Sequence, residues 1–258
     1  MCRLGDDLLV RLPRRALAAD LVRHEQRWLP VLAPRLPLPV PEPVRLGAPA
    51  LGYPWAWSVV PYLPGEIAAV APPTDLRETA VVLAEFLAAL HGPAAPDAPA
   101  NRHRGIPLRD RSELVETAAR DLAGMVDRGA VLAAWHSVAG VPEWDGPPLW
   151  LHGDLHPANI LVDHGRVSGV IDFGDVTAGD PATDLAVVWM LLPAECHGVV
   201  RDVYGTHHAW GAEDNTWARA RGWALALSLA FLAHSEDNPL MAEIGHRTLD
   251  AVLAGSYC

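Results

Sequence analysis

The sequence predicts an α+β fold of two unequal lobes, a small lobe of strands with one helix and a larger, mostly helical lobe. Short apolar strand patterns gather in the first 65 residues. From there to the C-terminus, apolar residues recur mainly at helical spacing. Between residues 149 and 184, two acidic motifs flank a hairpin pattern. We therefore expect a small lobe at residues 1–65, with a hinge at 61–65, and a helical lobe at residues 66–258.

The composition limits the class of protein. The chain has 258 residues, 50% of them hydrophobic, which is enough for a sizeable core. Its formal net charge of −11 argues against nucleic acid or an anionic membrane as a partner and suits a cationic small molecule. All 20 basic residues are Arg, so a phosphate-binding Walker A Lys and a Schiff-base Lys are both excluded.

The cysteines and the N-terminus are typical of a cytoplasmic protein. The three Cys residues are scattered without metal-binding spacing, which suits a reducing compartment. No signal-peptide pattern opens the sequence. The longest apolar stretch, residues 223–233, is too short to span a bilayer. We expect a cytoplasmic location and no membrane partner.

The small lobe is predicted to begin with a hairpin and a helix. Residues 1–4 and 8–12 flank a Gly-Asp-Asp turn, and residues 14–32 show helical apolar spacing. Glu25 falls on the inward face of this helix, where an acid needs a cation, and Arg11 on the preceding strand is the candidate partner. The alternatives are a solvated strand Arg and an ordinary helix-surface Glu.

The remaining elements follow from turn and capping signals. Strands are predicted at 44–46 and 55–62, after a proline-rich connection. Thr74 is the predicted N-cap of the next helix, and residues 110–113 resemble a capping box that opens another. Asp180 is the predicted N-cap of a later helix. The predicted helices are 74–90, 110–138 in two runs, 181–192, 194–210, 213–234 and 239–254.

Two acidic motifs lie in the central stretch, with a hairpin pattern between them. Residues 151–163 read L-H-G-D-L-H-P-A-N-I-L-V-D, and residues 170–175 read V-I-D-F-G-D. Residues 160–162 and 167–171 flank a His-Gly-Arg turn, which predicts two short antiparallel strands. Because a hairpin brings its two ends together, we expect the two motifs to meet.

Three side chains are the candidates for chemistry where the motifs meet. Asp154 and Asn159 precede the hairpin, and Asp172 follows it. Two carboxylates and one amide, with no thiolate among them, suit a hard cation such as Mg²⁺. The sequence therefore predicts a magnesium site beside the hairpin.

Two other interpretations of the first motif stay open. His152, Asp154 and His156 alternate, so on an extended strand they would face one way and could hold a transition metal in a hydrolase. Pro157 would break such a strand, and this interpretation leaves Asn159 and the second motif unexplained. The other alternative is a polar surface loop, which does not account for three acids and an Asn between apolar strands.

The motifs H-G-D-L-H-P-A-N-I-L and I-D-F-G-D, in this order, resemble the catalytic and metal-binding loops of the aminoglycoside phosphotransferase family. That family is similar to protein kinases, so the resemblance implies a protein-kinase-like two-lobe fold. It also implies an ATP- or GTP-dependent phosphotransferase that moves the γ-phosphate to a hydroxyl of a small molecule, with an aminoglycoside-like antibiotic as one candidate. Asp154 would be the catalytic base, and Asn159 and Asp172 would hold Mg²⁺.

The resemblance also implies which residues surround the nucleotide. They are Arg11, Glu25, Pro61, Leu63, Leu161 and Ile171. The first two would form a strand–helix ion pair at the phosphates, the next two would present a backbone carbonyl and a backbone amide to the adenine, and the last two would pack against its ring. His152 and Asp184 would support the catalytic loop, His152 by packing beneath it and Asp184 by accepting its hydrogen bonds.

In the family, two strands and a phosphate-covering loop come before the first full strand of this chain, and we expect both to be missing here. One wall of the nucleotide cleft would then be open to water, which weakens the attraction between Arg11 and phosphate. We expect poor ATP binding and slow turnover from this 258-residue chain. A kinase-like binding protein that is catalytically weak or silent is therefore the alternative function.

Overall fold

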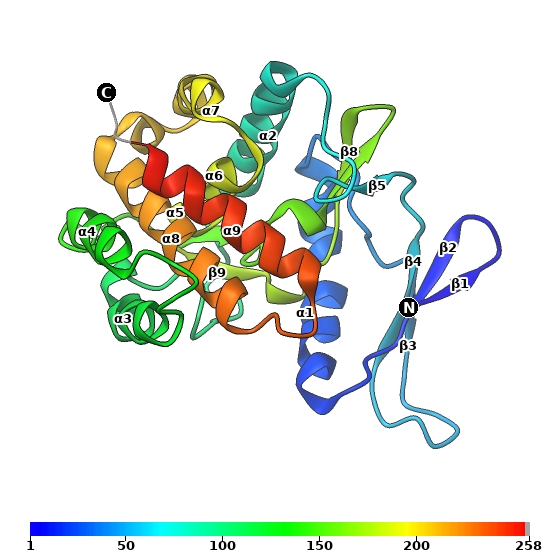
Figure 1. Ribbon diagram of the computed structural model, residues 1–258. Coiled ribbons are helices and arrows are strands. Elements are labelled where there is room, and N and C mark those ends of the chain that lie inside the picture. Colours follow the sequence, from blue (N-terminus) through cyan, green and yellow to red (C-terminus); the bar gives the residue numbers. More distant parts are fainter. Residues whose placement is uncertain (256–258) are drawn as a thin grey trace.

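The computed structural model describes residues 1–255, apart from the side chains of Leu17 and Ala212, and consists of a small sheet lobe beside a larger helical lobe (Figure 1). The predicted α+β class is confirmed. Helix α1 (Ala16–Leu32) packs between the two lobes, in contact with strand β4 and with the 3-10 turn at Phe173–Asp175 (Figure 1).

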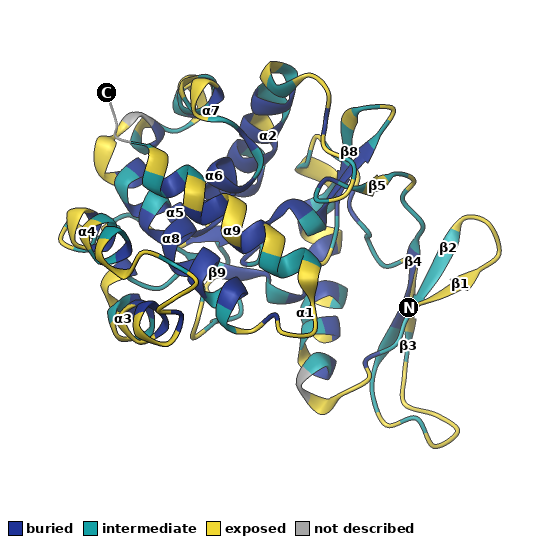
Figure 2. Ribbon diagram, viewed as in Figure 1, coloured by how far each residue is buried: buried dark blue, intermediate teal, exposed yellow. Residues whose placement is uncertain are grey.

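The sheet of the small lobe is antiparallel and has the strand order β1-β2-β4-β3. Its strands are β1 (Cys2–Leu4), β2 (Leu8–Arg11), β3 (Arg45–Gly47) and β4 (Trp57–Pro61). The predicted N-terminal hairpin is present, with Leu4 opposite Leu8. Strand β1 is exposed along its whole length, whereas the middle of β4 is buried against α1 (Figure 2). Strand β2 therefore joins an exposed edge to the buried centre of the sheet.

The helical lobe holds most of the apolar core. Its helices are α2 (Leu76–Leu90), α3 (Ser112–Asp121), α4 (Arg128–Val138), α5 (Ala182–Leu185), α6 (Val187–Leu191), α7 (Ala194–His207), α8 (Asp214–Ala233) and α9 (Pro239–Ala254). Helix α8 contributes more buried residues than any other helix in the described part of the chain, because it packs against α3, α4, α5 and α9 (Figure 2). Trp223 of α8 is fully buried. None of the helices in residues 1–255 combines the length and apolar character needed to cross a membrane.

The predicted central hairpin is present as β7 (Ile160–Asp163) and β8 (Arg166–Val170). Its two turn residues, His164 and Gly165, both have positive φ, as a two-residue hairpin turn requires. Three short strands were not predicted: β5 (Glu66–Ile67), which pairs with β7, and β6 (Leu149–Leu151) and β9 (Thr177–Gly179), which pair with each other. Segments of two or three residues are too short to show a strand period.

Two of the predicted helix caps are wrong. Asp75 caps α2 instead of Thr74, because the Asp75 carboxylate accepts the backbone N–H of Glu78 at 2.9 Å. At the predicted capping box, residues 108–111 form a 3-10 turn, and α3 begins at Ser112 without a side-chain cap. In both places the spacing indicated a helix correctly but placed its first residue wrongly.

Candidate active site

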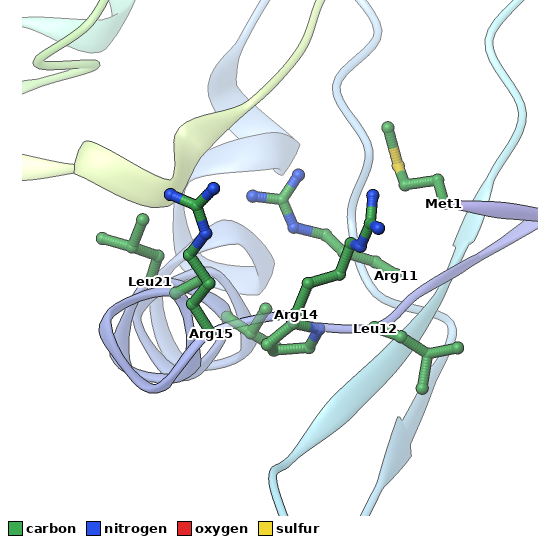
Figure 3. Close-up of a pocket in the computed structure, with 9 residues that line it drawn as sticks. Met1, Arg11, Leu12, Arg14, Arg15 and Leu21 are labelled. Carbon is green, nitrogen blue, oxygen red and sulfur yellow. The ribbon is translucent and has the colours of Figure 1, made fainter.

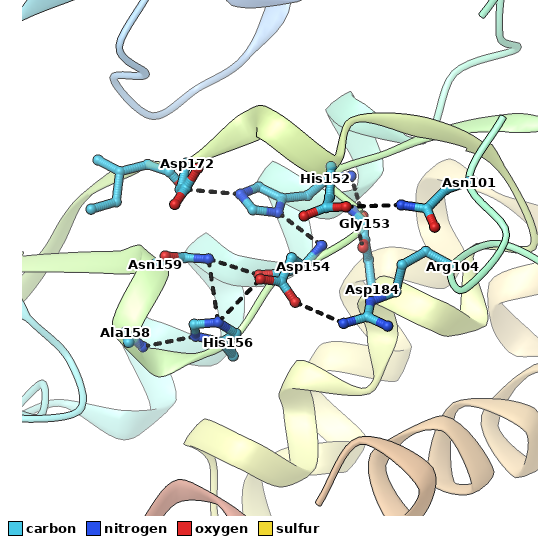
Figure 4. Close-up of polar contacts among 12 residues, drawn as sticks. Asn101, Arg104, His152, Gly153, Asp154, His156, Ala158, Asn159, Asp172 and Asp184 are labelled. Atoms are coloured by element: carbon cyan, nitrogen blue, oxygen red, sulfur yellow. Dashed lines mark hydrogen bonds and ion pairs between the residues drawn. The ribbon is translucent and has the colours of Figure 1, made fainter. Parts of the chain in front are cut away.

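A buried carboxylate fixes the loop that follows β6. Asp184 of α5 is fully buried and accepts the backbone N–H groups of His152 at 2.6 Å and Gly153 at 3.0 Å (Figure 4). Gly153 has φ +85°, and a Cβ atom there would lie 2.2 Å from the carbonyl oxygen of Asp175. Only glycine therefore lets this loop approach the second acidic motif so closely.

The His152 side chain connects the two motifs. Its Nδ1 accepts the backbone N–H of Asp154 at 3.2 Å, and its Nε2 donates to the carbonyl of Ile171 at 2.9 Å (Figure 4). The ring packs on Phe173, with centroids 4.5 Å apart. Because both ring nitrogens bind backbone groups, His152 has no free nitrogen with which to bind a metal ion.

The Asp154 carboxylate lies between the side chains of Arg104 and His156. Arg104 donates to its Oδ1 at 3.0 Å, and Nε2 of His156 lies 3.4 Å from its Oδ2 (Figure 4). Burial alone would raise the pKa of Asp154, but His156 and Arg104 outweigh this and hold the pKa well below its usual range. Asp154 is therefore ionised at neutral pH.

Asn159 and Asp172 lie on either side of the hairpin. The amide of Asn159 donates to the carbonyl of Asp154 at 2.9 Å, and its amide oxygen has no hydrogen bond from any described residue. The backbone N–H of Ile171 donates to the carbonyl of Asn159 at 2.9 Å, which joins the two ends of the hairpin. Asp172 follows with φ 63°, and its side chain is 52% exposed. The structure thus brings the three predicted residues to one place.

The oxygen atoms available at this place fit Mg²⁺. A magnesium ion takes one or two protein oxygens and completes its shell with water and phosphate, and the amide oxygen of Asn159 and the carboxylate of Asp172 are donors of that kind. Within residues 1–255, no group of three or more His, Cys, Asp or Glu side chains is arranged to hold a metal ion. The hydrolase interpretation based on His152, Asp154 and His156 therefore lacks the cluster it needs.

A cavity of about 190 Å³ lies between the sheet and the hairpin. Its lining includes all six residues that were predicted to surround a nucleotide, namely Arg11, Glu25, Pro61, Leu63, Leu161 and Ile171. Asp172 lines it as well, so the cavity adjoins one of the two predicted metal ligands. Strand β4 and the residues just after it form one wall, and the hairpin forms the opposite wall.

Arg11 joins this cavity to the second motif. Its Nε lies 2.7 Å from Oε2 of Glu25, the strand–helix pair predicted from the sequence, and its Nη2 lies 2.8 Å from Oδ1 of Asp172. Burial raises the pKa of Glu25 to about 8, although Arg11 acts in the opposite direction. The contact between Arg11 and Asp172 was not predicted.

Sequence reasoning also missed a loop that crosses the motifs. Arg104 contacts Asp154, and Asn101 donates to the carboxylate of Asp175 at 2.9 Å. The loop is anchored nearby, where the backbone N–H of Gly105 donates to the hydroxyl of Thr183. The only signal available was a polar N-R-H-R run, residues 101–104, after an Ala- and Pro-rich stretch.

The two lobes, the cavity between them and the acidic loops beside it define a kinase-like fold. A model of the phosphotransferase enzyme family, APH, matches residues 2–223. The chain belongs to this family. The resemblance found in the two central motifs is therefore confirmed.

Relatives with known sequences match part of the chain. It is 28% identical over 204 residues to the uncharacterized protein YcbJ of Bacillus subtilis (strain 168), covering 71% of this chain and 62% of that protein. It is 27% identical over 143 residues to an aminoglycoside 3'-phosphotransferase of Escherichia coli, covering 53% of each. The matches thus span roughly half to three-fifths of these relatives' length.

Solved structures share the fold at low sequence identity. One is APH(2")-IIia in complex with GDP and kanamycin, with a TM-score of 0.68 and 21% identity over 98% of this chain and 89% of that one. Another is the macrolide 2'-phosphotransferase MphH from Brachybacterium faecium, with a TM-score of 0.60 and 22% identity over 98% of this chain and 87% of that one. The kinase-like two-lobe fold is therefore confirmed.

Proposed function

We propose that the protein is a phosphotransferase that moves the γ-phosphate of ATP or GTP to a hydroxyl group of a small molecule. The observation that carries the proposal is that the cavity lined by the six predicted nucleotide-binding residues adjoins the loop of an ionised carboxylate, Asp154. Asp172 lines the cavity, and His152 connects the adjoining Ile171 to Asp154. Family membership and structural neighbours with bound GDP and ADP support it.

The nucleotide would bind in the cavity between the lobes. Leu161 and Ile171 provide apolar surface for the base, and the carbonyl of Pro61 and the amide of Leu63 would be its hydrogen-bond partners. Arg11 would bind the phosphates, since a guanidinium can grip phosphate oxygens through two N–H groups.

Asn159 and the second motif contribute the side chains that would hold a metal ion. Asn159 and Asp172 would hold Mg²⁺, which would neutralise negative charge on the phosphates. In the structure, Arg11 already bonds to Asp172. The two residues therefore act together, with Arg11 orienting the carboxylate and sharing the phosphate charge.

Asp154 would act on the acceptor. The acceptor oxygen forms a bond to the γ-phosphorus as the bond from that phosphorus to the β–γ bridging oxygen breaks, and the hydroxyl proton passes to the Asp154 carboxylate. Because its pKa is low, Asp154 contributes mainly by orienting the hydroxyl and receives the proton late in the transfer. Asp184 and His152 would hold the loop in position.

Hydroxyl-bearing antibiotics are the first acceptors to test. Structural neighbours were solved with kanamycin, gentamicin and streptomycin, and others are macrolide phosphotransferases. The net charge of −11 favours approach of a cationic molecule over an anionic one. The acceptor is therefore proposed as a small polyhydroxylated molecule.

The test is direct detection of phosphoryl transfer. The protein is incubated with ATP or GTP, with and without Mg²⁺, and with a panel of aminoglycosides, macrolides, amino alcohols and sugars. Mass spectrometry then measures the mass of each product. We expect one acceptor to gain a single phosphoryl group only when Mg²⁺ is present. Nucleotide binding without transfer to any acceptor would support the silent binding protein instead.

A further inference from the structure

A second hollow, of about 540 Å³, opens beside the start of α1 (Figure 3). It is lined by Met1, Arg11, Leu12, Pro13, Arg14, Arg15, Ala18, Leu21 and Val22. Arg11 also lines the proposed nucleotide cavity, so the two spaces adjoin at this side chain. Met1 is the other lining residue that the two spaces share.

The charge of this hollow is of one sign. Its lining contains three Arg side chains and no carboxylate, in a chain with a net charge of −11. Figure 3 shows the guanidinium groups of Arg11, Arg14 and Arg15 extending to the same side of the segment, with that of Arg11 between the other two in this view. Arg11 already faces two carboxylates, so the uncompensated positive charges are those of Arg14 and Arg15, which an anion in the hollow would neutralise.

Arg14 and Arg15 are available to a ligand. Arg11 has two carboxylate partners, but neither Arg14 nor Arg15 forms an ion pair or a side-chain hydrogen bond with any residue in the described part of the chain. Both are exposed. Each can therefore offer its full set of N–H donors.

The backbone that carries the two side chains is fixed on both sides. Pro13 is buried, and its carbonyl accepts the hydroxyl of Tyr53 at 2.8 Å. Arg15 is extended, with φ −141°, and helix α1 begins at the next residue. The turn that carries the two side chains is thus already ordered before an anion binds.

We propose that Arg14 and Arg15 form a polyphosphate-binding extension of the nucleotide site, so that affinity depends on the number of phosphates that pass Arg11. This inference rests on the proposed function, because it takes the base to lie in the cavity between the lobes. It predicts that triphosphates bind more tightly than diphosphates, and diphosphates more tightly than monophosphates. Arg14 and Arg15 recognise the phosphate chain, while the base contributes the affinity of the cavity between the lobes.

Calorimetric titration of the full chain with adenosine, AMP, ADP and Mg²⁺-ATP tests the proposal. Exposed charge pairs are weak, so we expect about a threefold to fivefold loss of ATP affinity for Arg14→Ala or Arg15→Ala and about tenfold or more for the double variant. Adenosine affinity should stay unchanged. Arg14→Lys combined with Arg15→Lys should keep most of the affinity, and Arg23→Ala, an exposed Arg on α1 paired with Asp20, should match the parent.

Inorganic triphosphate is titrated in parallel to distinguish a free anion from a nucleotide. If triphosphate alone binds as tightly as ATP, the hollow is an independent anion site, and the proposed extension is wrong. If the parent binds ATP and the double variant binds it equally well, the inference fails while the proposed function stands. If the parent binds no nucleotide or nucleoside at all, both fail together.

Discussion

The Asp154 carboxylate accepts a hydrogen bond from Arg104, which lies fifty positions earlier in the chain. Arg104 donates to Oδ1 of the carboxylate, and His156 lies beside Oδ2. Both groups lower the pKa of Asp154 and restrict its orientation. Arg104 is therefore expected to position the base.

Replacing Arg104 by Gln tests this role. Without the guanidinium, the carboxylate is free to rotate away from the acceptor, and we expect kcat to fall about tenfold, the equivalent of one lost charge-assisted hydrogen bond of about 1.4 kcal/mol. Nucleotide affinity should stay within about twofold, because Arg104 does not line the nucleotide cavity. Arg104→Lys should recover part of the rate. An Arg104→Gln variant with the parent's kcat would remove Arg104 from the account.

Glu25 provides a pH-dependent test, because burial raises its pKa to about 8. Its pKa in the unfolded chain is about 4.3, so the folded state binds the extra proton between these values. This contribution to stability is fully present below the unfolded pKa and is lost as pH rises through the folded pKa, at up to about 1.4 kcal/mol for each pH unit. The protein therefore loses this part of its folding stability between about pH 4.3 and pH 8.

Urea unfolding of the parent and of Glu25→Gln at pH 5.5 and pH 7.5 measures this effect. The amide cannot titrate, so we expect the variant to gain stability relative to the parent by about 1 kcal/mol or more over this interval. Other titrating groups cancel in the difference between the two proteins. A difference that does not change with pH would mean that Arg11 keeps Glu25 ionised throughout.

At the residue scale, the sequence identified groups that belong to recognisable motifs or lie on a helix face. The pair of Arg11 and Glu25 could be predicted because both lie on regular elements whose faces follow from spacing. Arg104 and Asn101 could not, because they lie in an irregular loop, where no periodicity says which way a side chain points. Arg11 shows the same limit. Its contact with Glu25 followed from residue spacing, whereas its contact with Asp172 did not.

At the level of secondary-structure elements, the loop after β6 is held by a carboxylate that lies far away in the sequence, that of Asp184. Asp184 satisfies two backbone N–H groups in a fully buried setting, and the imidazole of His91 lies 3.4 Å from it. Without the carboxylate, those N–H groups would have no acceptor. The position of Asp154 is therefore a consequence of how α5 packs beneath the loop.

Asp184→Ala is predicted to destabilise the protein by about 3 kcal/mol, from two buried N–H groups that lose charge-assisted hydrogen bonds. Denaturant unfolding measures it, with Asp202→Ala on the exposed side of α7 as the matched control, for which we expect a change within about 0.5 kcal/mol. Equal effects of the two substitutions would show that the loop does not depend on Asp184.

Elements long enough to show a period could be predicted closely. Helix α9 begins and ends where the spacing placed it, and α8 differs by one residue at each end. The strands β6 and β9 could not be predicted, because a pair of three-residue strands is specified by tertiary contacts and not by local pattern. They matter nonetheless, since β6 leads directly into the loop that carries Asp154.

For the whole molecule, the two lobes differ in how much core they hold. The β1–β2 hairpin is exposed or half-buried, whereas α8 lies inside the helical lobe (Figure 2). Regions with few buried contacts open locally at lower free energy. We expect hydrogen exchange about a hundredfold or more faster in residues 2–11 than in residues 220–232, and protection of residues 60–63 when Mg²⁺-ATP is added. Uniform exchange across both lobes would contradict this picture.

The central claim is that Asp154, held beside a Mg²⁺-nucleotide site, orients an acceptor hydroxyl for phosphoryl transfer. The most direct measurement is single-turnover transfer from ATP by the parent and by Asp154→Asn, on the acceptor that proves active, together with the nucleotide affinity of each. We predict that the variant binds Mg²⁺-ATP as the parent does and transfers phosphate about 10²-fold or more slowly, because an amide cannot accept the proton. A variant that keeps more than half of the parent's rate would contradict the account.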